Sequence, residues 1–327
     1  RVYGIYYCYY ERGFMKILIT GIQGFVGSNL VLQLKKNHTI YGLDIIIQAK
    51  EGVEQIYTWD DLDKGNIPSV DAIIHLAGKA HDVKNRADAS VYFKVNTELT
   101  KKIYNYYLTS KIERFIFFSS VKAAADFVSG EVLTEEVIPH PVGPYGESKI
   151  KAEEYLLGHL PTAEKKVYIL RPCMIHGPGN KGNLNLLYGV LRWGIPWPLG
   201  SFENRRSFTS IDNLKYVVEG LLTKEIESGI YHMADDEALS TNELVQVICE
   251  AMGKKGRIWK LPKCMMNGLA SIGTYLHLPL NKERITKLTE NYVVSNQKIK
   301  QALGIQKMPY TAEQGFIKTI QSFQKQK

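Results

Sequence analysis

A tyrosine and a lysine four residues apart are the side chains best suited to proton transfer. Tyr145 and Lys149 lie in the segment Tyr-Gly-Glu-Ser-Lys, and on a helix this spacing puts both on one face. A free tyrosine has a pKa of about 10, and a nearby ammonium favours the phenolate and lowers that pKa. Ser120, at an expected strand end, would orient a hydroxyl and stabilise developing charge. These types and spacings predict proton removal from an alcohol, coupled to hydride transfer.

A glycine-rich turn supplies the expected hydride carrier. Gly21, Gly24 and Gly27 form a GxxGxxG pattern that follows an apolar strand and opens a helix. The first glycine allows a tight turn, the second allows close approach to a diphosphate, and the third lets helix and sheet pack closely. The N–H groups that begin the helix favour an anion. The turn therefore predicts a dinucleotide site.

One carboxylate indicates which dinucleotide. Asp44 stands 23 residues after Gly21, near the spacing of a ribose-binding carboxylate. Such a group accepts hydrogen bonds from ribose hydroxyls and repels a 2′-phosphate, and the following residues 45–47 are three isoleucines with no arginine. The sequence therefore favours NAD over NADP.

The elements that position these residues alternate between apolar strands and amphipathic helices. Continuous apolar runs separated by helices are typical of buried parallel strands. We predict an α/β fold, a Rossmann-like doubly wound parallel sheet with a smaller C-terminal α/β substrate-binding cap. The expected strands are 17–20, 39–43, 72–76, 115–119 and 167–170, and the expected helices are 25–36, 91–108 and 145–157.

Three parts of the chain follow from this pattern. Residues 1–14 hold five tyrosines and precede Met15, which leads into the first strand, so we interpret them as an N-terminal extension. Residues 15–171 are predicted to form the NAD-binding domain, with some later segments returning to it. Residues 172–327 are predicted to form mainly the cap.

Composition excludes several classes of protein. The 327 residues are 45% hydrophobic and 23% charged, which is ordinary for a folded chain and excludes disorder. No apolar run is long enough to span a membrane. Four widely spaced cysteines form no CxxC pair, so we expect no disulfide scaffold, no metal site and a cytoplasmic location.

Together the motifs resemble the extended short-chain dehydrogenase/reductase family, specifically its nucleotide-sugar epimerase/dehydratase branch. The resemblance runs from Met15 to about Phe323. Its markers are TGIQGFVG at 20–27, HLAG at 75–78, VNT at 95–97, FFSS at 117–120, YGESK at 145–149, RPCMIHGPG at 171–179 and RRSFTSIDNL at 205–214.

The resemblance also implies roles for individual residues. Ser120, Tyr145 and Lys149 would be the catalytic residues, and Asn96 would help to hold the active-site helix. Substrate contacts would come from Ser120, Asn183, Arg206 and Arg284. Cofactor contacts would come from Gly21, Gly24, Phe25, Val26, Gly27, Asp44, Leu76, Ala77, Gly78, Asn96, Tyr145, Lys149 and Pro172.

The branch contains several reactions, and the sequence separates them in part. Its dehydratases carry an acidic pair directly after the strand-end hydroxyls, whereas this chain has Val121 and Lys122. We therefore expect C4 epimerisation of a UDP-hexose or UDP-N-acetylhexosamine through a 4-keto intermediate. One alternative is an NAD(P)H-dependent UDP-4-keto-6-deoxy-hexosamine 4-reductase of polysaccharide biosynthesis. Another is a non-catalytic NAD-binding regulator, although such a protein is expected to lose the catalytic residues.

The charge is unevenly distributed. The chain has 41 basic and 33 acidic residues, but residues 254–327 carry a net charge of +11 and residues 1–253 carry −3. A basic cap suits an anionic diphosphate such as a UDP-sugar, and without a nucleic-acid motif we expect no nucleic-acid partner. The stretch from Lys254 to Lys260, with the apolar residues after it, offers a less favoured alternative, contact with an anionic membrane surface. The apolar residues of helix 91–108 favour a homodimer, or packing on the sheet.

Overall fold

The computed structural model describes residues 13–79, 88–128, 130–162, 164–180, 182–266, 268, 271 and 282–325, without the side chains of 282–284 and 287. Most of the expected N-terminal extension and the side chain of Arg284 lie outside the described residues.

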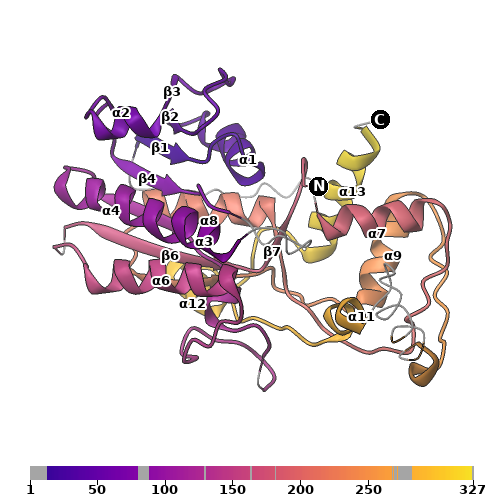
Figure 1. Ribbon diagram of the computed structural model, residues 1–327. Helices are drawn as coiled ribbons and strands as arrows, with labels where there is room; N and C mark the ends of the chain where they lie inside the picture. Colours follow the sequence, from indigo (N-terminus) through magenta and orange to yellow (C-terminus); the bar gives the residue numbers. More distant parts are fainter. Residues whose placement is uncertain are drawn as a thin grey trace.

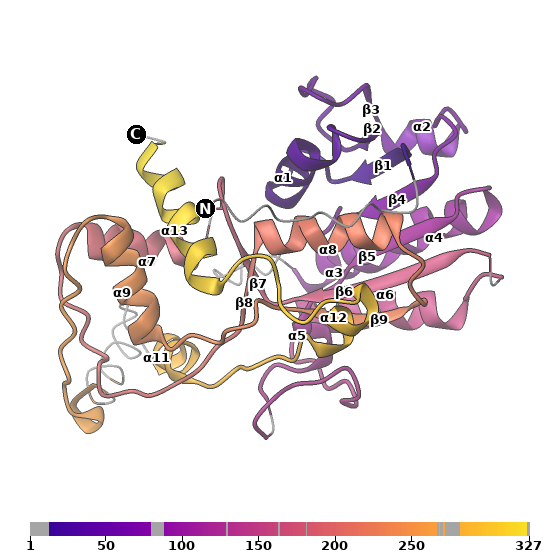
Figure 2. The ribbon, with the colours of Figure 1, turned by 180° about the vertical axis from the view of Figure 1, so that it is seen from behind.

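Seven parallel strands form one sheet in the order β3-β2-β1-β4-β5-β6-β9 (Figures 1 and 2). The central strands are buried on both faces because they consist almost entirely of apolar residues. β1 pairs with both β2 and β4, so the strand order reverses there, and ligands of such sheets bind at the carboxyl ends beside this reversal. The predicted doubly wound sheet is confirmed. The strands are β1 Lys16–Thr20, β2 Thr39–Leu43, β3 Gln55–Tyr57, β4 Ala72–His75, β5 Arg114–Phe118, β6 Lys166–Pro172 and β9 Gly229–Met233.

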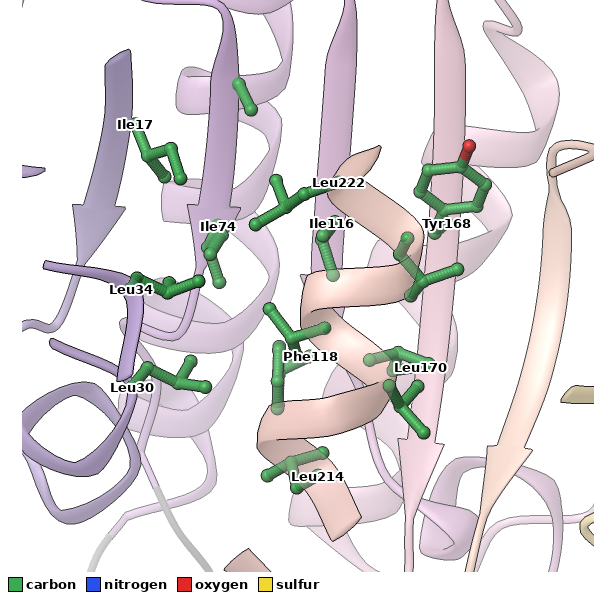
Figure 3. Close-up of a cluster of buried hydrophobic side chains, with 14 of the residues drawn as sticks. Ile17, Leu30, Leu34, Ile74, Ile116, Phe118, Tyr168, Leu170, Leu214 and Leu222 are labelled. Carbon is green, nitrogen blue, oxygen red and sulfur yellow. The ribbon is translucent and has the colours of Figure 1, made fainter. Parts of the chain in front are cut away.

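Helices cover both faces of the sheet. On one face, α1 (Phe25–Leu34), α8 (Ile211–Thr223) and α12 (Gln297–Leu303) bury an aliphatic cluster against the strands. Figure 3 shows Leu214 and Leu222 of α8 over Ile116 and Leu170 of the sheet. On the other face, α4 (Leu99–Thr109) and α6 (Pro144–Gly158) pack with the short α2 (Trp59–Asp63).

The predicted helix 91–108 is not a uniform α-helix. It consists of α3 (Ala89–Tyr92), a π-helical segment η1 (Phe93–Glu98) and α4. π-Helical turns are rare and occur frequently at functional sites. Here the segment contains Asn96, whose side chain is fully buried.

A second apolar core lies in the cap. It is enclosed by α7 (Asn183–Arg192), α9 (Thr241–Ala251), α11 (Lys282–Thr289) and α13 (Ala312–Lys325), and the pair β7 (Met174–His176) and β8 (Phe208–Ser210) stands beside it. Figures 1 and 2 show α7 and α9 at the end of the molecule away from β1–β4. Although α8, β9 and α12 follow residue 172, they pack on the sheet.

Within the described residues, no helix combines the length and apolar character that a bilayer-spanning helix requires. The same part of the chain has no group of three or more His, Cys, Asp or Glu placed to hold a metal ion.

Candidate active site

The glycine turn joins β1 to α1 in the conformation that a diphosphate site requires. Gly21 has φ +68°, and a Cβ there would lie 2.8 Å from the Ala77 nitrogen. A Cβ on Gly27 would lie 2.8 Å from the Gly21 carbonyl oxygen, so only glycine allows this close crossing. Gly24 precedes α1 without a side-chain cap, which leaves N–H groups for a ligand; Phe25 and Val26 are the first residues of the helix.

Asp44 lies just beyond the end of β2 and holds the turn from the side. It is 8% exposed, and its carboxylate accepts hydrogen bonds from the backbone N–H groups of Gln23 (3.0 Å) and Ile45 (2.8 Å). The carboxylate is therefore fixed beside the turn, where the ribose of a dinucleotide is expected.

Lys50 is a residue of this region that the sequence reasoning missed. Its Nζ donates to Gln23 Oε1 (3.0 Å) and to Ser28 Oγ (2.8 Å). Burial lowers the pKa of Lys50, and the nearby Asp44 opposes that shift. An ammonium held beside the first turn of α1 adds to the positive potential that attracts a diphosphate. The sequence does show a lysine shortly after the second strand, but its spacing alone does not indicate where its side chain points.

The loop after β4 is held by a chain of buried polar groups. The Thr20 hydroxyl lies 2.7 Å from His75 Nδ1 and accepts from the N–H groups of Leu76 (3.2 Å) and Ala77 (3.1 Å). On its other side His75 Nε2 lies 2.9 Å from the Thr100 hydroxyl. Burial lowers the pKa of His75 to about 3, so the imidazole is neutral and fits a positioning role.

Asn96 connects that loop to the active-site helix. Its side chain accepts from the Lys79 N–H (2.8 Å) and donates to the Ser148 hydroxyl of α6 (2.9 Å). A Cβ on Gly78 would meet Asn96 Oδ1 at 3.0 Å and Lys149 Nζ at 3.3 Å. Because it lacks a Cβ, Gly78 lets the loop lie directly against Asn96 and Lys149.

Ser120, Tyr145 and Lys149 meet at the carboxyl end of β5. Ser120 follows the strand, and its side chain forms a hydrogen bond with that of Tyr145. Lys149, on α6 with Tyr145, donates from Nζ to the Phe118 carbonyl (2.8 Å). Burial lowers the pKa of Lys149 to about 8, and Glu153 opposes that shift. The three side chains predicted to act together do lie together.

The pKa of Tyr145 differs from the one expected from the sequence. The sequence argument gave Tyr145 a lowered pKa, whereas in the chain alone burial raises its pKa and the Ser120 hydrogen bond opposes that rise. The physical reason is that burial penalises the phenolate, while the Lys149 ammonium is directed at the Phe118 carbonyl. A nicotinamide cation bound here would favour the phenolate.

A buried ion pair behind the lysine was also missed. Glu153, one helical turn after Lys149, accepts from Arg171 Nε at 3.0 Å, and both side chains are inaccessible to solvent. Ser119 donates to the same carboxylate. The pair fixes α6 to β5 and β6, close to the other residues of the site. The sequence could have indicated this pair, because Glu153 lies four residues after Lys149 and so on the same face of the helix.

The expected substrate side lies where the cap meets β5 and β6. Arg206 reaches within 3.8 Å of Glu290, and its backbone pairs with Tyr292. The Tyr292 hydroxyl donates to the Ala125 carbonyl (2.7 Å), and Lys122 lies over its ring at 4.7 Å. Arg206 is thereby brought to the residues that follow Ser120.

The other predicted contacts are spread around this edge. Asn183 is exposed as the first residue of α7, and Pro172 is the buried last residue of β6. The side chain of Arg284, on α11, lies outside the described residues.

Comparison with known proteins defines the class. The NAD dependent epimerase/dehydratase family model matches residues 17–218, so the chain belongs to that family and is an NAD-dependent enzyme. The resemblance inferred from the motifs is confirmed. Because the glycine turn and the fixed Asp44 suit a dinucleotide, these residues fit NAD.

Within the family the chain is similar to enzymes that act at the sugar C4 position. It is 30% identical to the UDP-glucose 4-epimerase of Vibrio cholerae over 94% of this chain and 95% of that protein. It is 27% identical to the N-acetyl-alpha-D-glucosaminyl-diphospho-ditrans,octacis-undecaprenol 4-epimerase of Escherichia coli O157:H7, over 93% and 94%. The fold is shared with the UDP-glucose 4-epimerase of Thermotoga maritima solved with UDP-glucose, with a TM-score of 0.74, 20% identity, and coverage of 95% of this chain and 99% of that one.

Proposed function

We propose that this enzyme interconverts the C4 epimers of a UDP-hexose or UDP-N-acetylhexosamine. The observation that carries the proposal is the Ser120–Tyr145–Lys149 set at the carboxyl edge of the sheet, with Val121 and Lys122 where a dehydratase would have carboxylates. The similarity to a UDP-glucose 4-epimerase over nearly the whole chain supports it.

We propose one step for each of these side chains. The Tyr145 phenolate takes the proton of the C4 hydroxyl as that carbon loses hydride, which leaves a 4-keto sugar. Ser120 donates to the C4 oxygen and keeps it beside the tyrosine. Burial raises the pKa of Tyr145, and we propose that Lys149, one helical turn away on α6, supplies positive charge that offsets part of this rise when substrate and cofactor are bound. NAD supplies the acceptor and later the donor of the hydride when bound.

Epimerisation then requires the keto sugar to rotate in the active site so that it presents its other face. Hydride returns to the opposite face of C4, and Tyr145 gives its proton back to the oxygen. Tyr145 finishes as it began and bound NAD would do the same, so the reaction balances without an external reductant. Arg206 is proposed to hold the substrate diphosphate during this turn, because its planar guanidinium binds phosphate bidentately.

A second candidate substrate has the same sugar chemistry on a different carrier. The similarity to an epimerase that acts on an undecaprenyl-diphosphate-linked N-acetylglucosamine favours a lipid-linked amino sugar. The reaction at C4 is unchanged, and Arg206 again faces a diphosphate. The 4-keto reductase remains the alternative reaction.

The decisive experiment is a substrate panel with purified enzyme. UDP-glucose, UDP-N-acetylglucosamine, undecaprenyl-diphospho-N-acetylglucosamine and a UDP-4-keto-6-deoxy-hexosamine are each incubated with and without NADH. We expect C4 epimers from one or more of the first three without added NADH, and none from a Tyr145→Phe variant. Conversion of the keto sugar alone, with stoichiometric loss of NADH, would establish the reductase instead.

We also propose a homodimer formed through α4 and α6. Much of the apolar surface that prompted this expectation packs on the sheet, since Ile103, Tyr104 and Tyr107 are fully buried. Exposed apolar residues remain at Val91 and Leu157. A monomer mass in light scattering at micromolar concentration would contradict the dimer.

A further inference from the structure

The outer end of the cap carries exposed apolar side chains that the proposed chemistry does not use. Trp193 is 75% exposed and Trp259 is 56% exposed. We call these two tryptophans and their neighbours the cap-end surface. Its exposed apolar residues are Leu186, Val190, Trp193, Ile195, Trp259 and Met265.

Two segments far apart in the sequence form this surface. The Trp197 N–H donates to the Arg257 carbonyl, and the Trp259 N–H donates to the Trp197 carbonyl, both at 2.8 Å. Lys254 Nζ donates to the Arg192 carbonyl at the end of α7 (2.6 Å). Figures 1 and 2 show the chain around these residues along the end of the molecule opposite β1–β4.

The two segments that form the surface are rich in basic residues, and the acidic residues Glu203 and Glu250 lie just outside them. Ranges 182–200 and 251–266 together contain six basic residues and no acidic one. Five of the six are exposed, and the sixth, Arg192, lies over the ring of Trp193 at 5.3 Å. The five exposed residues are Lys254, Lys255, Arg257, Lys260 and Lys263.

We propose that the cap-end surface binds the headgroup region of an anionic lipid bilayer. Tryptophan side chains favour the boundary between hydrocarbon and headgroups, and basic side chains around them attract anionic phosphates. The sequence pointed to 254–260 together with apolar residues up to Ile272. The structure adds Trp193 and Ile195 from a separate segment, while Leu269, Ala270 and Ile272 lie outside the described residues.

Charge also favours a bilayer over a second copy of the chain as the partner of the cap-end surface. A two-fold dimer through this surface would place the same positive patch against itself, and neither of the two ranges supplies an acidic residue to balance it. A lipid surface brings the opposite charge and also accepts the apolar side chains.

The position of the surface suits an enzyme that works beside a membrane. α7 begins at Asn183, on the proposed substrate side, and ends at Arg192, on the cap-end surface. Ten helical residues span about 15 Å. Membrane contact does not depend on which sugar carrier is the substrate, and a lipid-linked carrier would gain most from it.

The test is flotation of the full chain with vesicles of phosphatidylcholine, with and without phosphatidylglycerol. We expect phosphatidylglycerol to raise the bound fraction at least several-fold, and added salt to reverse the rise. Lys254→Glu/Lys255→Glu should abolish the rise. The matched control is Lys64→Glu/Lys111→Glu, which makes the same charge change at exposed lysines of the sheet domain and should bind like the unmodified chain. Equal loss in both variants, or no response to phosphatidylglycerol, would overturn the proposal.

A second measurement does not depend on charge-reversal variants. Brominated phosphatidylglycerol should quench the tryptophan fluorescence of the unmodified chain, and Trp193→Ser/Trp259→Ser should remove most of that quenching. Unchanged quenching in this variant would contradict insertion of the two tryptophans. If the variants instead change the mass in light scattering and leave vesicle binding intact, the surface is a subunit interface and the membrane proposal is wrong.

Discussion

The buried charge of Lys149, a residue proposed to assist catalysis, lowers the stability of the folded chain. Lys149 is 5% exposed, and burial lowers its pKa from 10.5 to about 8. Below pH 8 the folded chain therefore keeps a buried ammonium, which corresponds to roughly 3 kcal/mol of destabilisation relative to the neutral amine. The unfolded chain binds more protons between pH 8 and 10.5, so this part of the stability returns as the pH rises.

Replacing this lysine should separate activity from stability. We expect Lys149→Met to lower kcat at least about 100-fold, because the charge beside Tyr145 is lost. At pH 7 the variant should be more stable by about 1–2 kcal/mol, since the loss of the bond to the Phe118 carbonyl offsets part of the gain. Urea unfolding at pH 7 and 9.5 measures this, and the difference from the unmodified chain should shrink at the higher pH. Lys111→Met, at an exposed position, is the control; a Lys149→Met chain less stable at pH 7 would contradict the argument.

His232 should contribute to unfolding in acid. It is fully buried on β9, and burial together with Arg171 lowers its pKa to about 3. Between pH 6.5 and 3 the unfolded chain binds a proton that the folded chain does not, so stability falls as the pH falls. We expect His232→Gln to reduce the slope of unfolding free energy against pH between 6.5 and 4. Chemical denaturation at several pH values measures the slope, and the same slope in the variant and the unmodified chain would refute the assignment.

At the scale of elements, the sequence predicted best where burial is complete. β1, β4, β5 and β6 each contain an unbroken run of three or four apolar residues, so their pattern identified them within a residue or two. β3 has only three residues and lies at the sheet edge, and β9 contains His232, so neither gave that signal. The π-helical segment and the pairing of Arg206 with Tyr292 depend on contacts between distant segments, which a local pattern does not contain.

The close contact between α1 and the glycine turn after β1 gives a prediction, and a second glycine of the chain provides its control. A Cβ on Gly27 would lie 2.8 Å from backbone atoms of Gly21 and Ile22, so Gly27→Ala must push the helix away from the turn. We expect it to weaken NAD binding at least tenfold and to lower stability. A Cβ on Gly189, inside α7, would meet no atom within 4 Å, so Gly189→Ala should raise stability by about 0.5–1 kcal/mol and leave NAD binding unchanged. Calorimetric titration with NAD measures the affinity of both variants, and equal NAD affinity in the two would rule out the close-crossing argument.

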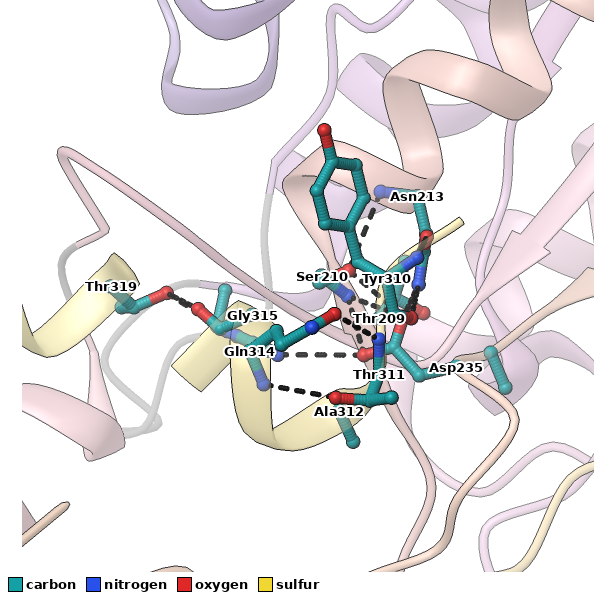
Figure 4. A network of polar contacts seen from close by, with 12 residues as sticks. Thr209, Ser210, Asn213, Asp235, Tyr310, Thr311, Ala312, Gln314, Gly315 and Thr319 are labelled. Atoms are coloured by element: carbon teal, nitrogen blue, oxygen red, sulfur yellow. Dashed lines mark hydrogen bonds and ion pairs between the residues drawn. The ribbon is translucent and has the colours of Figure 1, made fainter. Parts of the chain in front are cut away.

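At the scale of the whole molecule, the last helix is joined to the sheet domain by a buried polar network (Figure 4). Asp235 is 2% exposed and accepts from the Ser210 N–H and hydroxyl (both 3.0 Å) and from the Asn213 amide (2.7 Å). Asn213 in turn exchanges two hydrogen bonds with the backbone of Tyr310, just before α13. The network therefore connects β8 and α8 to the C-terminal helix that packs in the cap.

His176 belongs to the same network and is better explained by packing than by catalysis. Its Nδ1 lies 3.0 Å from the Thr319 hydroxyl, its ring stacks on Phe316 with centroids 3.8 Å apart, and it is fully buried. Although a serine, an aspartate and a histidine lie close together here, the histidine and the aspartate have no access to a substrate. The group holds α13 in place.

Asp235→Asn should loosen this connection between the two parts of the molecule. The new amide would present a donor where the carboxylate accepts from three donors, so we expect a loss of about 1–3 kcal/mol in unfolding free energy. Asp212→Asn is the matched control, because Asp212 also contacts α13, through Lys318 at 2.8 Å, but in a partly exposed ion pair, where the loss should stay below about 1 kcal/mol. Limited proteolysis should cut Asp235→Asn faster than Asp212→Asn in the segment before α13. Equal cleavage and equal stability of the two variants would show that the buried network does not hold the helix.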